Sequence, residues 1–338
     1  MFDKIEPFII AEVGQNHQGD LEKAREYIKI FSFAGADAIK FQTRNNKYLF
    51  SKKAYEANYS SENAFAKTYG KHREKLELSF DSMKILKADC EKYGIKFMST
   101  PFDEPSLELL KEVDIDLIKV ASFDLGNLPF LNRIKELKKP VVMSIGGGKI
   151  NEIRESVKIL NSKIKDLAIL HCVSEYPCQY NRLGLGNIKK LIEEFPDCII
   201  GSSDHFNGIL SGPVAYMIGA RVFEKHVTLN RGWKGTDHSF ALEPEGFRKF
   251  VRDIKRVNLM LPEKNQTELG KEEVFKKLGK SLTAFKDIQI GDKFTLENLS
   301  GKIFNSTFIP VRKSHEIIGK KSKRKILENE AITMDDVE

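Results

Sequence analysis

The sequence has no apolar run approaching the roughly 20 residues that a membrane-spanning helix requires. Its four cysteines form no C-x-x-C pair, which argues against a disulfide framework and against a zinc site. The first residues, Met1 to Pro7, include acids and lack the apolar core of a signal peptide. Internal repeats and low-complexity tracts are also absent. We therefore expect a protein of the reducing cytoplasm with no membrane partner.

The charge balance is only mildly positive, at +7 from 55 basic and 48 acidic residues. No basic stripe interleaved with aromatic residues is present, so we expect no nucleic-acid partner. Two interpretations of the surplus remain open. It is either a solvated surface rich in lysine and glutamate, or a positive cleft that attracts a small substrate carrying carboxylate and phosphate groups.

Short apolar runs alternate with amphipathic stretches, which predicts an α/β protein. Eight runs have the length and composition of buried strands: Phe8–Glu12, Ala38–Gln42, Ile95–Ser99, Leu117–Ala121, Pro140–Ser144, Leu167–His171, Cys198–Ser202 and Val222–His226. Eight helical patterns follow them in turn: Leu21–Phe33, Phe80–Tyr93, Glu104–Glu112, Leu128–Leu137, Ile150–Leu160, Leu185–Glu194, Ile209–Ile218 and Pro244–Met260. Strict alternation of eight pairs favours a closed parallel (β/α)8 TIM barrel, with a doubly wound open sheet as the alternative.

Two segments depart from this alternation. Residues 43–79, between the second strand and its helix, are too long for an ordinary connection, and we expect them to cover the barrel mouth. We place the barrel at residues 1–262, a polar linker at 263–278 and a small β-rich domain at 279–338, with a strand at Ser281–Ala284 and a short helix near Thr295–Leu299. A domain this small has little core of its own, so we expect it to pack on a barrel, its own or a partner's.

Polar side chains gather at the predicted carboxyl ends of the strands, where TIM barrels hold their active sites. Alternation along the strands turns Lys40, Gln42 and Lys119 towards the barrel axis. Buried lysines need anionic partners, so they either pair with carboxylates such as Glu12 and Asp124 or bind an anionic ligand. Hydroxyl groups suited to phosphate or carboxylate lie at neighbouring strand ends: Ser122, Ser144, Ser174 and Ser203.

Two histidines end adjacent strands, His205 the seventh and His226 the eighth. Two inward imidazoles at one height suit a divalent cation, although a buried histidine is also a common structural residue. Glu12, at the end of the first strand, is the candidate acid or base, with a salt bridge to Lys40 as the structural alternative. Because two lysines lie near, we expect the pKa of Glu12 to be lowered.

Motifs at these strand ends occur in a characteristic order along the chain. They are Ile10-Ala11-Glu12-Val13-Gly14-Gln15-Asn16-His17, Gly35-Ala36-Asp37-Ala38-Ile39-Lys40-Phe41-Gln42, Ser99-Thr100-Pro101-Phe102, Ser203-Asp204-His205, Glu224-Lys225-His226 and Gly235-Thr236-Asp237-His238-Ser239. Taken together they resemble the N-acetylneuraminate (sialic acid) synthase family, which includes legionaminic and pseudaminic acid synthases. The tail from Gly279 resembles the family's antifreeze-like (SAF, β-clip) domain, which implies a cap on the partner's barrel in a domain-swapped homodimer.

The resemblance implies an enzyme that joins phosphoenolpyruvate to N-acetylmannosamine or a related N-acylated hexose, with water, to give a nonulosonic acid and phosphate. It implies catalytic roles for Glu12, Lys40, Lys119 and Asp124. It implies a divalent metal, Mn²⁺ before Mg²⁺ or Co²⁺, on His205 and His226. The implied phosphoenolpyruvate ligands are Lys40, Lys119, Ser122, Ser144, Ser174 and Ser203. The implied sugar contacts are Gln42, Asn63, Thr100, Phe102, Asp124, Tyr176 and Asp237.

Departures from the family pattern leave the acceptor sugar open. Ile303 stands where bacterial relatives carry an arginine that contacts the N-acyl group. Three motifs resemble those of animal-type synthases, some of which accept a 6-phosphorylated sugar: Tyr59-Ser60-Ser61, Lys67-Thr68-Tyr69-Gly70 and Trp233-Lys234-Gly235. Lys67, Lys71 and Arg73 in the segment 43–79 are either phosphate ligands or part of a solvated loop face.

Three rival functions also remain open. The first is another phosphoenolpyruvate-dependent barrel that makes a shorter sugar acid from a sugar phosphate. The second is a Schiff-base aldolase with Lys119 as the nucleophile, which borohydride trapping with pyruvate would reveal. The third, suggested by the tail alone, is a non-catalytic carbohydrate-binding or ice-binding protein. The inward lysines, the two histidines and Glu12 argue against this third function.

Overall fold

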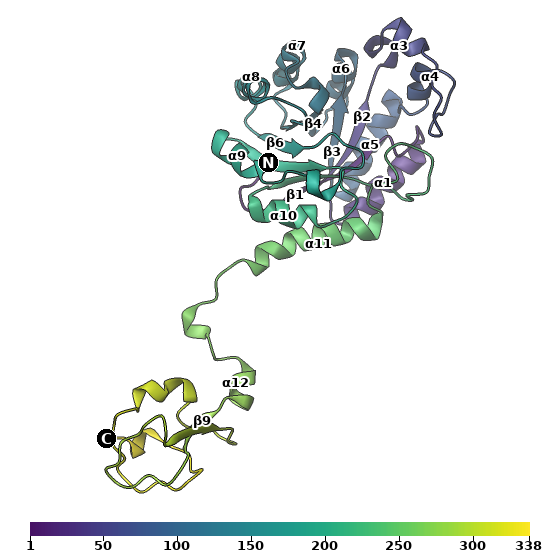
Figure 1. Ribbon diagram of the computed structural model, residues 1–338. Coiled ribbons are helices and arrows are strands. Elements are labelled where there is room, and N and C mark those ends of the chain that lie inside the picture. The colour runs from purple at the N-terminus through teal and green to yellow at the C-terminus, as the bar shows by residue number, and fades with distance from the viewer. The chain divides into compact units, whose positions relative to one another are not determined.

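The computed structural model describes residues 1–338, which divide into two compact units, Met1–Leu261 and Pro262–Glu338. In the first unit, parallel strands surrounded by helices form a barrel (Figure 1). The barrel has eight strands and is closed, because β8 pairs with β1. The strands are β1 (Phe8–Gly14), β2 (Ala38–Thr43), β3 (Lys96–Pro101), β4 (Leu117–Val120), β5 (Val141–Ser144), β6 (Leu167–Cys172), β7 (Ile199–Asp204) and β8 (Val222–His226). The predicted TIM barrel is confirmed, and the open sheet is excluded.

Helices pack around the outside of the barrel. The eight that follow the strands are α1 (Leu21–Phe33), α5 (Phe80–Tyr93), α6 (Glu104–Glu112), α7 (Leu128–Ile134), α8 (Ile150–Asn161), α9 (Asn187–Glu194), α10 (Ser211–Ile218) and α11 (Pro244–Met260). Short 3₁₀ turns lie at Ser122–Asp124, Lys135–Leu137 and Tyr180–Arg182. Side-chain caps fix several helix starts, as where Asp20 accepts the backbone N–H of Lys23. None of the helices is both long and apolar enough to cross a bilayer.

Successive side chains of the strands point to opposite faces and pack into two separate apolar cores. Ile39 and Phe41 of β2 belong to the large core between the sheet and the helices. A smaller core fills the barrel interior with eight buried residues: Ile10, Ala38, Met98, Leu117, Val142, Ala168, Leu170 and Val222. Lys40 lies between the two outward residues of β2, so its side chain faces the axis, as the alternation predicts. The interior core closes the barrel beneath the polar residues of the strand ends.

The long segment between β2 and α5 is folded rather than extended. It contains three short helices, α2 (Asn46–Leu49), α3 (Lys52–Glu56) and α4 (Tyr69–Glu74). Helices this short cannot show a repeating apolar face, which is why the sequence predicts only a connection here. The buried ring of His72 lies 4.6 Å from the ring of Tyr59 and 5.8 Å from that of Phe65. This aromatic cluster stabilises the segment that carries Asn63 and Arg73.

The second unit has its own small core and a two-stranded antiparallel sheet. Its elements are the 3₁₀ turn Gln266–Glu268, α12 (Glu273–Leu278), β9 (Ser281–Ala284), β10 (Leu299–Lys302) and the 3₁₀ turns Val311–Glu316 and Met334–Asp336. The predicted strand at Ser281–Ala284 is confirmed. The predicted helix near Thr295–Leu299 is wrong, because the Asn298 side chain accepts the Thr295 N–H at 2.7 Å and closes a turn before β10. Part of the predicted linker is helical, as α12.

Gly201 lies at the most crowded point of β7. A Cβ atom there would lie 2.2 Å from the carbonyl oxygen of Val222 and 2.5 Å from Cδ2 of Leu170. We expect Gly201→Ala to lower the free energy of unfolding by about 1–3 kcal/mol, because the added methyl group forces two paired strands apart. Thermal unfolding measures this loss. An unchanged melting temperature would show that this contact does not limit the spacing of β7 and β8.

Candidate active site

The carboxyl ends of the barrel strands surround a cavity of about 770 Å³, a volume within the range of small-molecule sites. Its walls also include residues of the β2–α5 segment and of the loop after β8. Most predicted site residues line it: Glu12, Lys40, Gln42, Asn63, Thr100, Phe102, Lys119, Ser122, Ser144, Tyr176, Ser203, His205, His226 and Asp237. The fold therefore brings together side chains that are spread over more than 200 residues of sequence.

Two predicted site residues do not line this cavity. The Asp124 carboxylate accepts a hydrogen bond of 3.0 Å from the Asn127 side chain at the start of α7. Ser174 lies beside the glycine turn after β5, since its hydroxyl oxygen is 2.4 Å from where a Cβ of Gly146 would stand. The backbone N–H of Gly146 donates a hydrogen bond of 2.9 Å to the Ser122 hydroxyl oxygen. Substrate contacts by Asp124 and Ser174 thus stay predictions to which this geometry adds no support.

The two inward lysines have different partners. The Lys40 Nζ lies 2.7 Å from Glu12 Oε2 and 3.6 Å from Glu224 Oε1, so Lys40 is an ion-pair partner, one of the two predicted alternatives. Lys119 is 3% exposed, and its Nζ donates only to the Ser144 hydroxyl at 2.7 Å and to the Val120 carbonyl at 3.0 Å. No carboxylate oxygen lies within 4.0 Å of it. A buried ammonium group without a carboxylate in direct contact favours the second alternative, an anionic ligand.

The site differs from the sequence prediction in the pKa of Glu12 and in a second buried carboxylate, Glu224. Burial raises the pKa of Glu12 to about 7, because it outweighs the opposing effect of Lys40. The predicted lowered pKa is therefore wrong. Burial also opposes ionisation of Glu224, but Lys119 and Lys40 together lower its pKa. Sequence reasoning did not single out Glu224, although it precedes His226 by two residues and the alternation of β8 turns both inwards.

The two histidines lie side by side, with ring centroids 5.3 Å apart. Nδ1 of His205 is 2.9 Å from the Val173 carbonyl oxygen, so this nitrogen carries the proton and leaves Nε2 with a free lone pair. Burial lowers the pKa of His205 to about 4 and lowers that of His226 as well, which keeps both rings neutral at pH 7. Nδ1 of His226 is buried without a hydrogen-bond partner. Two neutral imidazoles with unused lone pairs suit a divalent cation, whose other ligands would be water or substrate oxygens.

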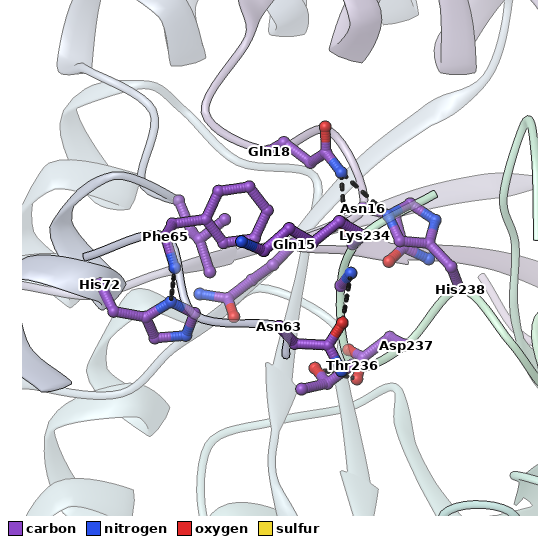
Figure 2. A pocket seen from close by; sticks show the side chains of 12 residues that line it. Gln15, Asn16, Gln18, Asn63, Phe65, His72, Lys234, Thr236, Asp237 and His238 are labelled. Atoms are coloured by element: carbon purple, nitrogen blue, oxygen red, sulfur yellow. Dashed lines mark hydrogen bonds between the residues drawn. The ribbon is translucent and has the colours of Figure 1, made fainter. Parts of the chain in front are cut away.

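The mouth of the cavity is built by the β2–α5 segment and the loop after β8. Figure 2 shows a small pocket that adjoins this mouth, in which the Asn63 side chain reaches across to that loop and accepts the N–H of Gly235 at 2.9 Å. Asp237 lies beside it, and Gln18 connects to the same loop through the carbonyl of Lys234. Tyr176 packs against His205, with the two ring centroids 3.8 Å apart. Amide and carboxylate groups at this mouth suit the hydroxyl groups of a sugar.

Two arginines also line the cavity, and sequence reasoning singled out only one of them. Arg44 follows β2 directly, and its guanidinium lies 4.0 Å from the centre of the Phe102 ring. Arg73 of α4 donates to the Gln15 side chain and to the Tyr69 hydroxyl. Lys67 and Lys71, the other predicted phosphate ligands of this segment, are exposed and do not line the cavity. Arg44 was missed because it lies beyond the alternating strand pattern.

Comparison with known proteins now identifies the family. The sequence model of the NeuB family matches residues 27–266. The chain belongs to the NeuB family. The predicted resemblance to the sialic acid, legionaminic and pseudaminic acid synthases is thereby confirmed.

Relatives of this NeuB-family chain match it over nearly its whole length. It is 35% identical to the N-acetylneuraminate-9-phosphate synthase of Mus musculus, over 98% of this chain and 92% of that protein. It is 34% identical to the N,N'-diacetyllegionaminic acid synthase of Campylobacter jejuni, over 96% of this chain and 98% of that protein. The crystal structure of the sialic acid synthetase of Leptospira borgpetersenii, in complex with citrate, aligns with a TM-score of 0.70 and 31% identity, covering 80% of this chain and 91% of that one.

Proposed function

We propose that this NeuB-family chain condenses phosphoenolpyruvate with the open-chain form of an N-acylated hexose and releases inorganic phosphate. The product is a nine-carbon nonulosonic acid. The observation that carries the proposal is Lys119, a buried ammonium group without a carboxylate partner at the floor of the cavity. The named relatives that make N-acetylneuraminate 9-phosphate and diacetyllegionaminic acid support the same reaction type.

The floor of the cavity suits the phosphate and carboxylate groups of phosphoenolpyruvate. Lys119 and Lys40 supply positive charge, and the hydroxyl groups of Ser144, Ser203 and Ser122 line the same cavity. Ser144 already accepts from Lys119 at 2.7 Å, so one phosphate oxygen can bind both groups at once. Because these groups are fixed by the barrel, they need little rearrangement when negative charge collects on the leaving phosphate.

The acceptor would lie above phosphoenolpyruvate, with its carbonyl group near the two imidazoles. A divalent cation held by His205 and His226, Mn²⁺ before Mg²⁺ or Co²⁺, would polarise the carbonyl oxygen of the acceptor. Gln42, Asn63 and Asp237 line the wall beyond and would bind the hydroxyl groups of the sugar chain. Together these contacts would hold the aldehyde carbon against C3 of phosphoenolpyruvate.

The bond changes then follow from the positions of the side chains. C3 of phosphoenolpyruvate forms a bond to the aldehyde carbon, and the aldehyde oxygen takes up a proton. C2 becomes electron-poor, and a water molecule adds to it while Glu12 accepts the proton of that water. The new hydroxyl group on C2 then gives up its proton to the leaving phosphate and forms the carbonyl group of the product, while the bond between C2 and the phosphate oxygen breaks and phosphate leaves with both electrons of that bond. Lys119 and Lys40 stabilise the charge that the phosphate carries away.

A Glu12→Gln variant tests the role of Glu12 in this sequence. We expect kcat to fall by about 10²-fold, the lower range for loss of a positioned base. Because the pKa of Glu12 is about 7 and the ionised form is the active base, wild-type kcat/KM should fall as the pH drops below about 7. The variant should not show this fall of kcat/KM at acidic pH. If it shows the same fall, a group other than Glu12 causes the pH dependence.

The reaction itself is tested with a panel of acceptors and phosphate release as the measurement. The panel contains N-acetylmannosamine, its 6-phosphate, diacetamido-trideoxyhexoses, and the phosphates of arabinose and erythrose. We expect release with N-acylated hexoses only. Turnover of arabinose or erythrose phosphate instead would assign the chain to a different sugar-acid synthesis on the same barrel. Carbon 6 of the hexose becomes carbon 9 of the product, so a 9-phosphate product comes from a 6-phosphorylated acceptor. The relatives leave the phosphorylation of the acceptor open, because one is named for a 9-phosphate and another for an acid without phosphate.

Further proposals concern the second unit and the setting of the protein. We propose that the barrel spans residues 1–262, a linker residues 263–278, and an SAF-type cap residues 279–338, exchanged between the chains of a homodimer. The small antiparallel sheet of β9 and β10 supports this assignment. Light scattering after chromatography tests the dimer, and a monomer would contradict it. The four free cysteines support a place in the reducing cytoplasm.

A further inference from the structure

A second cationic site lies in the wall of the cavity, apart from the two lysines. It consists of Arg44 and Arg73, which come from the end of β2 and from α4. The side chain of Arg44 is only 8% exposed. Its guanidinium lies on the Phe102 ring, which holds the plane of the group in a fixed orientation. Both arginines line the cavity that contains the reaction site, and neither has a role in the chemistry proposed above.

Only one of these two arginines has a carboxylate in direct contact. Arg44 has one carboxylate partner, Glu77, with 3.4 Å between Nη1 and Oε1. Arg73 has no carboxylate oxygen within 4.0 Å and donates only to the neutral oxygens of Gln15 and Tyr69. Each guanidinium carries five N–H groups, so both keep donors free after these bonds are made. Glu77 is the one carboxylate within 4.0 Å of either guanidinium group, and Asp237 acts on Arg44 from farther away, so Arg73 keeps its charge without a direct ion pair.

The position of this site relative to the lysines fits the far end of the acceptor. Lys40 and Arg44 are four residues apart along β2 and its continuation, which places their Cα atoms roughly 13 Å apart in an extended chain. Gln42 lies between them and connects the two sites, because its amide donates to Glu12 at 2.8 Å and its carbonyl oxygen accepts from Arg44. An acceptor whose carbonyl carbon lies above phosphoenolpyruvate would thus extend past Gln42 and end at the arginines.

We infer that Arg44 and Arg73 bind a phosphate group on the terminal carbon of the acceptor, so that the preferred acceptor is an N-acylated hexose 6-phosphate. This inference rests on the proposed function and specifies its substrate class. Two guanidinium groups present paired N–H donors that match the oxygens of a phosphate monoester, a geometry that a neutral hydroxyl group cannot use. Loss of either group should therefore affect the phosphorylated acceptor far more than the unphosphorylated one.

The test measures kcat/KM for N-acetylmannosamine 6-phosphate and for N-acetylmannosamine, with phosphate release from phosphoenolpyruvate, in wild type and in three variants. The variants are Arg73→Gln, Arg44→Gln and the control Lys71→Gln, which changes an exposed lysine on the same helix as Arg73. We expect the wild type to prefer the 6-phosphate. We expect Arg73→Gln and Arg44→Gln each to lower this preference by about 10- to 100-fold, the usual effect of losing a charge-assisted hydrogen bond. Lys71→Gln should keep the wild-type preference.

The outcomes separate this inference from the proposed function. Equal turnover of both acceptors by the wild type, or a preference that Arg73→Gln leaves unchanged, would overturn the phosphate site and leave the reaction in place. No phosphate release with either acceptor would overturn the reaction and the site together. Arg44→Gln leaves Glu77 without its partner, so its melting temperature is measured as well. If that variant does not fold, Arg73→Gln alone decides the question.

Discussion

Replacing Lys119 with methionine should lower kcat/KM for phosphoenolpyruvate by roughly 30- to 5,000-fold, the loss expected when one partner of a buried charge pair is removed. The loss should appear mainly as a higher KM for phosphoenolpyruvate, because the role proposed for Lys119 is to bind the substrate before the chemical step. Steady-state kinetics with the acceptor held at saturation measures it. An unchanged KM would show that the phosphate group binds elsewhere.

The same substitution should stabilise the protein without ligand. Burial lowers the pKa of Lys119 from its ordinary value of 10.5, so the protonated side chain costs folding free energy at neutral pH. Lys119→Met removes that cost and should raise the melting temperature at pH 7. Because the cost is present below the lowered pKa and disappears above 10.5, the gain should shrink as the pH rises towards that value. A lower melting temperature at pH 7 would mean that the ammonium group has a stabilising partner.

Borohydride trapping distinguishes two roles of Lys119, a nucleophilic amine and a phosphate-binding ammonium group. A Schiff-base aldolase would use this amine as a nucleophile, and borohydride would then trap pyruvate on the protein. We expect no trapping, because the ammonium form that binds phosphate is not nucleophilic. A covalent adduct on Lys119, found by mass spectrometry, would replace the phosphate-binding role with a catalytic amine.

Replacing His226 with alanine should lower kcat by roughly 10³-fold, because the Lewis-acid contribution of a bound cation is several kcal/mol. Its Nδ1 makes no hydrogen bond, so the substitution leaves no buried partner unsatisfied and the fold should persist. Calorimetric titration with Mn²⁺ gives a measurement that does not depend on turnover. The variant should bind Mn²⁺ far more weakly than the wild type.

A neighbouring histidine provides the matched control. His171 of β6 is also buried, but its Nε2 bonds to the Leu183 carbonyl at 2.7 Å and it does not line the cavity. His171→Ala should keep the wild-type affinity for Mn²⁺ whatever its effect on stability. Full activity of His226→Ala, or equal loss of Mn²⁺ binding in both variants, would contradict the assignment of His205 and His226 as ligands.

The inward direction of the site residues could be predicted because it depends only on strand alternation. Lys40 lies between Ile39 and Phe41, two apolar residues that must face the helices, so only one direction was left for its side chain. The same alternation brings His226 inwards on β8, next to the end of β7 that carries His205. Periodicity and strand order together thus determined most of the cavity floor.

Burial and irregular segments set the limit of that prediction. The pKa of Glu12 depends on how completely the barrel excludes water, and on the nearby Glu224, neither of which is visible in the pattern around Glu12. Arg44 lies past the last residue of β2, where alternation ends, and Arg73 lies on α4, in the irregular segment that contains the aromatic cluster around His72. Residues placed by loops rather than by strands were therefore the ones that the sequence left open.

A crystal structure of the protein with phosphoenolpyruvate and Mn²⁺ tests the central claim most directly. The account predicts the phosphate group within about 3 Å of the Lys119 ammonium group and the Ser144 hydroxyl, below a cation bound to His205 and His226. Phosphoenolpyruvate bound outside the barrel mouth, or a Lys119 side chain that makes no contact with it, would contradict the account.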